Sequence, residues 1–202
     1  MHDIARYLYE MGHLKQVRRA GWWIAGVHTP ESVAEHSFRT AILGYILAML
    51  EGADADTTMR MCLFHDTPES RVTDLDRVAQ RYLQAVKASE AQVFEEQMTR
   101  LPAVIADALR ATMAEAAQRE TSLEARVAKD ADRLECLIQA REYQARGYRD
   151  AEDWIRNNYA ELMTDSARQL ADACLELEPG SWWRGLKLMP DTNVSADEQR
   201  ES

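Results

Sequence analysis

The chain has few of the residues that interrupt helices: eight glycines and five prolines among 202 residues. Apolar residues recur at spacings of three and four through most of the sequence, and no alternating strand pattern competes with them. No apolar run approaches the ~18 to 20 residues that cross a membrane, and the N-terminus has no apolar signal segment. These absences predict an all-α protein of the cytoplasm that has no membrane partner.

Positive charge is also scarce. Lysine and arginine number 24 against 34 aspartate and glutamate residues, which gives a net charge of -10. A protein that binds the backbone of a nucleic acid needs a basic stripe on its surface. The composition therefore argues against a nucleic-acid polymer as partner. A small anionic ligand stays open if a cation and a few arginines reverse the local field.

Cysteine is rare and unpatterned. Cys62, Cys136 and Cys174 are an odd number without close spacing, and each stands in an apolar helical run. They are interpreted as reduced core thiols. The length suits one well-buried core and is short for two. We therefore expect one helical domain over residues 1–180 and a polar extension over residues 181–202, disordered after Pro190.

The helical pattern predicts the course of the chain. The first helix runs out near Arg19. Ser32 and Glu35 form the pattern of a capping box, which places His36 in the first turn of the next helix. Residues 38–50 are apolar almost all round, so this helix is expected to be central and buried on most sides. A long helix follows Pro68, and residues 103–117 form another that buries Val104 and Ile105, among others.

The stretch from Leu63 to Glu69 is the most informative one, because an apolar helical run ends there in an adjacent His65 and Asp66. Pro68 disfavours helical backbone at the residue before it, so the helix is expected to end at this pair. An adjacent imidazole and carboxylate resemble half of a metal site. His36 offers a further ligand.

Asp130 and Asp132 offer the remaining carboxylate. They are two positions apart, about 200° around a helix, so only one can face a common site, and the spacing leaves both open. Two imidazoles and two carboxylates suit Mn, Co, Fe, Zn or a tolerant Mg site and lack the thiolates of structural zinc. A buried histidine or a solvated aspartate is the ordinary alternative for any one of them.

Four spaced blocks resemble the HD-domain metal-dependent phosphohydrolases, and within them the branch of bacterial and eukaryotic 5'-deoxynucleotidases. The blocks are Arg19-Ala-Gly21-Trp22, Pro30-Glu-Ser-Val-Ala-Glu-His36, His65-Asp66-x-x-Glu69-x-x-x-x-Asp74 and Lys129-Asp-Ala-Asp132-x-Leu134-Glu135, the last continuing into Ile138-Gln-Ala-x-Glu-Tyr143. The resemblance covers about residues 1–180. It implies a helical bundle with the metal site at the junction of its central helices.

The same resemblance implies that one divalent metal ion is bound by four residues, and it favours Asp132 over Asp130. The four are His36, His65, Asp66 and Asp132. The implied reaction removes phosphate from a small phosphomonoester, with a deoxyribonucleoside 5'-monophosphate as the preferred substrate. A homodimer is implied as well, and the Trp182-Trp183 pair after the last helix is a candidate surface for it.

The resemblance also suggests roles around the metal. Glu69 is placed to move a proton to the leaving alkoxide, and Asp74 is a family position near the substrate sugar or phosphate. Arg19 is the expected guanidinium for phosphate, with Arg18 as the solvent-exposed alternative. Trp22 is either a stacking platform for a base or a core residue.

Two alternatives remain open at this stage. One is a phosphodiesterase or another nucleotide phosphohydrolase on the same site, and the other is a metal- or nucleotide-binding regulatory module without turnover. Glu69 and Asp74 favour an enzyme, because a binding module needs no residue for proton transfer. Thr73 stands where many relatives have glycine and Pro68 where a small residue is common, so the nucleotide preference rests on resemblance alone.

Overall fold

The computed structural model describes residues 1–83, 85–184 and 186. Within these residues the secondary structure is helical, apart from an isolated antiparallel bridge between Arg18 and Ser32. The predicted all-α class is confirmed. The elements, in chain order, are α1 (His2–His13), α2 (Gly21–Ile24), α3 (Val33–Glu51), α4 (Ala55–Phe64), α5 (Glu69–Val72), α6 (Arg77–Tyr82), α7 (Val86–Met98), α8 (Ala103–Ala116), α9 (Leu123–Ala145), η1 (Arg149–Ala151), α10 (Glu152–Ala160), α11 (Asp165–Glu176) and η2 (Ser181–Trp183).

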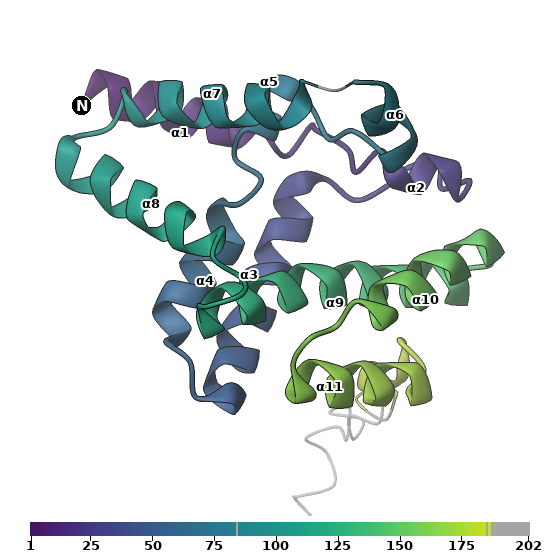
Figure 1. Ribbon diagram of the computed structural model, residues 1–202. Helices are drawn as coiled ribbons and strands as arrows, with labels where there is room; N and C mark the ends of the chain where they lie inside the picture. The colour runs from purple at the N-terminus through teal and green to yellow at the C-terminus, as the bar shows by residue number, and fades with distance from the viewer. Residues whose placement is uncertain (84, 185, 187–202) are drawn as a thin grey trace, which may run out of the picture.

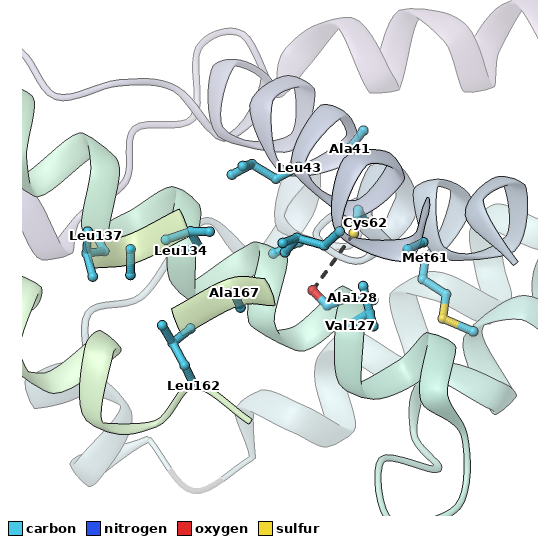
Figure 2. Close-up of a cluster of buried hydrophobic side chains, with 14 residues drawn as sticks. Ala41, Leu43, Met61, Cys62, Val127, Ala128, Leu134, Leu137, Leu162 and Ala167 are labelled. Carbon is cyan, nitrogen blue, oxygen red and sulfur yellow. Dashed lines mark hydrogen bonds between the residues drawn. The ribbon is translucent and has the colours of Figure 1, made fainter. Parts of the chain in front are cut away.

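The largest apolar core lies where α3 and α4 meet α9 and α11 (Figures 1 and 2). The close approach of α3 and α4 depends on Gly44, because a Cβ at this position would lie 2.5 Å from Cys62 Sγ. Cys62 Sγ also lies 3.8 Å from the backbone oxygen of Ala128 in α9, the contact drawn in Figure 2. The three helices that carry or precede His36, His65 and Asp132 are therefore packed against one another.

Local signals position the first two of these histidines. The backbone N–H of Glu35 donates to Ser32 Oγ, and the N–H of Ser32 donates to the Glu35 carboxylate at 2.6 Å, so the predicted capping box is present. Gly52, with φ 74°, ends α3 as its C-cap in the left-handed conformation. α4 ends at Phe64, so the predicted helix end directly before His65 is confirmed.

Two predicted helices were drawn too long. α1 ends at His13, because the following segment bonds to the chain before α3: the N–H of Val33 donates to Val17 O at 2.9 Å and that of Arg19 to Glu31 O at 3.0 Å. The long helix expected after Pro68 is three helices, α5, α6 and α7. The carboxylate of Asp76 accepts the N–H groups at the start of α6, a local bond that competes with helix continuation.

The burial expected for two helices is also corrected. Val104 and Ile105 of α8 are 79% and 42% exposed, because α8 packs through Ala106 and Leu109 instead. α3 is buried along one side only. Its other side carries an exposed apolar row, here called the α3 stripe: Phe38, Ile42, Tyr45, Ile46 and Met49, each at least 44% exposed. A helix that is apolar all round does not show which of its sides the fold covers.

Cys62, Cys136 and Cys174 are free, and burial raises the pKa of the Cys62 and Cys136 thiols. Among the described residues, no helix combines the length and the apolarity needed to span a membrane. The disorder predicted after Pro190 concerns residues that lie outside the described part of the chain.

Candidate metal centre

His36 lies in the first turns of α3 and is wholly buried. Its Nδ1 is hydrogen-bonded to the Glu135 carboxylate of α9. Its Nε2 points the other way and lies 3.2 Å from Asp132 Oδ1 and 3.7 Å from Asp66 Oδ2. With Glu135 accepting from Nδ1–H, the lone pair of Nε2 is directed at the two aspartates.

His65 shows the same arrangement one residue past the end of α4. Its Nδ1 lies 2.7 Å from the backbone oxygen of Cys62, a group that can only accept, so Nδ1 carries the proton and Nε2 the lone pair. This Nε2 lies 3.1 Å from Asp66 Oδ2 and 3.7 Å from Asp132 Oδ1. Both imidazoles therefore present Nε2 to the same two carboxylates.

Asp130 and Asp132 occupy opposite sides of α9. Asp132 reaches the two imidazoles, and its second oxygen lies 2.6 Å from Lys129 Nζ. Asp130 is fully buried and accepts hydrogen bonds from the N–H groups of Met163 and Thr164 and from the Thr164 hydroxyl. Asp130 thus anchors the chain before α11, and it also lies 3.8 Å from a guanidinium nitrogen of Arg133.

These residues fit a cation. Ligand atoms of His36, His65 and Asp132 all lie within 4.8 Å of one another, and Asp66 Oδ2 lies beside both imidazoles. Both Nε2 atoms and Asp66 Oδ2 are buried without a hydrogen-bond partner in the described residues. Buried polar atoms are rarely left in this state. Two imidazole nitrogens and two carboxylate oxygens suit a borderline divalent ion.

The charges also call for a cation. Burial alone would lower the pKa of His65, but Asp66 and Asp132 raise it well above its usual value. The same neighbours act in reverse on Asp66, whose pKa is lowered to about 2 by His65, His36 and Arg19 against the effect of burial. The carboxylates thus draw positive charge onto the imidazoles. A divalent ion supplies that charge and leaves both rings neutral.

A second layer holds His36, and the sequence analysis assigned no role to it. Glu135 is fully buried, with one oxygen on His36 and the other accepting from Arg39 Nε at 2.9 Å. Arg39 also binds Glu142 and Gln139. Glu135 follows Asp132 by three residues and Arg39 follows His36 by three, so each pair shares a helix face. This spacing of three residues was the signal in the sequence from which the roles of Glu135 and Arg39 could have been predicted.

Glu135→Gln is expected to weaken binding of Mn²⁺ or Co²⁺ by roughly 10- to 100-fold, because a neutral amide makes the His36 imidazole a poorer ligand. Competition with a chromophoric chelator measures the affinity. Glu142→Gln is the matched control, since it also removes a carboxylate partner of Arg39 but does not touch His36. Equal affinities in the two variants would contradict the role of Glu135.

Arg19 lies at the edge of the cluster, with a guanidinium nitrogen 3.6 Å from Asp66 Oδ2. Burial would lower its pKa, but Asp74 and Asp66 raise it well above the usual value, so it stays charged. Arg18 points elsewhere: it donates to the backbone oxygen of Pro30 and lies 3.8 Å from Glu35. Of the two arginines, Arg19 alone lines the cavity described below.

Glu69 opens the short helix α5, and its Oε2 is buried with no hydrogen-bond partner in the described residues. Burial, reinforced by the charges of Asp66 and Asp74, raises the pKa of Glu69 to about 10. A cation at the cluster would lower that value by offsetting the aspartates. Without one, the carboxyl group carries a proton at neutral pH.

Asp74 is held by the backbone, since its Oδ2 accepts the N–H of Ala20 at 2.7 Å. The preceding Thr73 has φ 64° and ψ 162°, a backbone region that is essentially confined to glycine. The turn therefore aims Asp74 at the loop before α2 in spite of its β-branched residue.

Replacing Thr73 by glycine is expected to raise the free energy of unfolding by about 1 kcal/mol. Removing a β-branched side chain from this region relieves roughly 1–3 kcal/mol, and the added backbone freedom of glycine offsets about 0.5–1 kcal/mol. Urea unfolding followed by circular dichroism gives the value. A variant that unfolds at a lower urea concentration than the wild type would show that the threonine makes compensating contacts.

Trp22 is 1% exposed and belongs to a core cluster, where its ring packs against Tyr143 and Trp154. Its indole N–H donates to Glu31 at 3.0 Å. Burial, with Glu135 nearby, raises the pKa of Glu31 to about 7. The core-packing alternative describes this environment, and little of the ring is left for a base to stack on.

One cavity of about 500 Å³ connects these groups. Its lining includes Arg19, Asp66, Glu69, Asp74 and Asp132, and it extends along α6 and α10. The volume lies within the roughly 300–1,000 Å³ of typical small-molecule sites. Fold and site together define a helical protein with a candidate divalent-cation site beside a ligand-sized cavity.

Comparison with known proteins names the family. The family model of the HD domain matches residues 11–174. The chain is 28% identical to 5'-deoxynucleotidase HDDC2 of Danio rerio over 71% of each protein, and 30% identical to that of Dictyostelium discoideum over 71% of this chain and 79% of the relative. A solved structure, a conserved hypothetical protein from Pyrococcus furiosus, covers 86% of this chain and 99% of its own length at 28% identity and a TM-score of 0.72. The chain belongs to the HD-domain family.

Proposed function

We propose that the protein is a metal-dependent phosphohydrolase that releases phosphate from a deoxyribonucleoside 5'-monophosphate. The observation that carries the proposal is that Asp66, Asp132, the partly buried Arg19 and the carboxyl group of Glu69 line a single cavity, beside the Nε2 atoms of His36 and His65, which have no hydrogen-bond partner in the described residues. The names of the relatives support the choice of substrate. A site that only binds a ligand has no need of Glu69.

In this proposal His36, His65, Asp66 and Asp132 hold one divalent ion. Such an ion polarises a phosphoryl oxygen and lowers the pKa of water, which generates a nucleophile at neutral pH. Mn, Co, Mg, Fe and Zn are all compatible with the nitrogen and oxygen ligands.

The chain supplies the remaining chemistry. The charged guanidinium of Arg19 binds the phosphate oxygens and offsets the negative field of the aspartates. Glu69 holds a proton and delivers it to the leaving 5'-alkoxide, which is too basic to depart unprotonated. Asp74, fixed by the N–H of Ala20, positions the sugar or phosphate. These roles place the cleaved bond between Arg19 and Glu69.

A substrate panel tests the function. The purified protein is loaded with Mn, Co, Mg or Zn. Release of phosphate is measured from deoxyribonucleoside and ribonucleoside 5'-monophosphates and from 3'-monophosphates, and cleavage of a phosphodiester is measured alongside. The proposal expects the highest kcat/KM on 5'-deoxyribonucleotides. Faster cleavage of the diester would favour the phosphodiesterase alternative, and turnover of none would favour a regulatory module.

We also propose that the protein acts as a homodimer in the cytoplasm. The three free cysteines suit a reducing compartment. Two surfaces could form the dimer: the α3 stripe, and η2, where Trp182 and Trp183 are 75% and 40% exposed. The α3 stripe is the stronger candidate, because its five apolar side chains lie along one helix and contiguous exposed patches of this kind mark interaction sites.

Light scattering at micromolar concentration is expected to give about 46 kDa, twice the 23.1 kDa of the chain. Ile42→Glu is expected to return the mass to that of one chain, because a carboxylate at the centre of an apolar contact is left unpaired. Val104→Glu, at another exposed apolar position, is the control, and Trp182→Ala tests the second surface. A wild-type mass of one chain would rule out the dimer.

A further inference from the structure

We infer that the wall of the cavity formed by Trp154, Asn157 and Asn158 of α10 binds the base of the nucleotide, which stacks on the indole of Trp154. The inference rests on the proposed function, because it concerns the substrate of the same site. It replaces Trp22 with Trp154 as the stacking residue.

The cavity is continuous from the cation cluster to α10. Arg19, Asp66 and Asp132 line it, and so do Gln80 of α6 and Trp154 and Asn157 of α10. In Figure 1, α10 lies alongside α9, the helix of Asp132, and α2 and α6 lie across from it. A monoester with its phosphate at Arg19 therefore has space of the right size for its remaining atoms, and α6 and α10 border that space.

The two parts of the lining differ chemically. Asp66, Asp132, Arg19 and Lys129 line the cavity beside the cation cluster, whereas α10 contributes the amides of Asn157 and Asn158, the indole of Trp154 and the carboxylate of Asp153. Asn157 is exposed, and Asn158 is partly buried, with its NH₂ group donating to Trp154 O at 2.8 Å. Amide groups and an indole match a neutral, flat ring with hydrogen-bonding edges.

Trp154 is the more accessible of the aromatic rings that line the described cavity. Among the described lining residues the aromatic rings are Trp22 and Trp154. Trp22 is 1% exposed, whereas Trp154 is only partly buried. The two ring centroids lie 5.6 Å apart at a 32° tilt, and a Cβ at Gly21 would lie 3.6 Å from Trp154 Nε1. Trp22 and Gly21 thus border the indole of Trp154, which lines the cavity and keeps part of its surface exposed.

Stacking on an indole tolerates any base, because every base has a π-face. The four deoxyribonucleotides are therefore expected to react with similar kcat/KM. The presence of a base is expected to change kcat/KM more than the identity of that base does.

The test compares dAMP with 2-deoxyribose 5-phosphate, two esters with the same primary alkoxide leaving group that differ by the base. The readout is the ratio of their kcat/KM values on Mn-loaded protein. Trp154→Ala is expected to lower this ratio by roughly 5- to 150-fold, the usual effect of losing one stacked base, and Trp154→Phe to retain most of it. Trp182→Ala, outside the cavity, is the control.

Asn157→Trp is the second variant, since a bulky side chain at this exposed position blocks the base end without disturbing the core. It is expected to lower kcat/KM for dAMP far more than for 2-deoxyribose 5-phosphate, and the resulting fall in the ratio decides the matter if Trp154→Ala fails to fold. A wild-type ratio near one, or equal losses on both esters, would overturn the inference and leave the proposed function standing. Hydrolysis of neither ester by the wild type would overturn both.

Discussion

Glu69→Gln is expected to lower kcat on dAMP by roughly 10²- to 10⁴-fold and to leave metal content and substrate affinity unchanged. Burial raises the pKa of Glu69 to about 10, so the group that glutamine replaces is already uncharged in the absence of a cation. Glutamine thus keeps the shape of the side chain and the charge of its protonated form, and the transferable proton is lost. Rapid-quench and steady-state assays of phosphate release measure the effect.

The leaving group separates proton delivery from other roles. p-Nitrophenolate departs without help, so Glu69→Gln is expected to affect p-nitrophenyl phosphate far less than dAMP. Glu95→Gln, which removes an exposed carboxylate on α7, is the control. Equal losses on both substrates with metal retained would mean that Glu69 positions another group and that Asp74 is the acid. Loss of the metal would make Glu69 a ligand.

His65→Ala and Asp66→Ala are each expected to reduce bound divalent metal from about one ion per chain to almost none. Removing one of four ligands leaves too few to replace the hydration shell of the ion. Activity is expected to disappear with the metal. Inductively coupled plasma analysis after purification gives the metal content.

His28→Ala is the control for these variants, because His28 is exposed in the loop before α3 and is absent from the cluster. Circular dichroism shows whether the fold is kept. Unchanged metal in both the His65 and Asp66 variants would refute the site.

Much of this site follows from the sequence through local rules. The capping box of Ser32 and Glu35 predicted the start of α3, and Pro68 predicted that the helix before it ends near His65. The all-α class follows from the spacing of apolar residues. These signals act within a few residues, so they are readable without the fold.

What depends on distant partners was not readable. Asp130 and Asp132 fit a helix equally well, and only the packing of α9 against Thr164 separates their environments. Trp22 and Trp154 are far apart in sequence. Only the fold brings the two rings together and determines which of them is buried. The α3 stripe was missed for the same reason, because the sequence of a helix that is apolar all round does not indicate which side faces the core.

The central claim is that the cluster of His36, His65, Asp66 and Asp132 binds the cation on which phosphate release depends. The most direct measurement is a titration of metal-free protein with Mn²⁺ while phosphate release from dAMP is followed. The account predicts no release before addition, a linear rise and a plateau at about one ion per chain. Full activity of the metal-free protein in the presence of a chelator would contradict it.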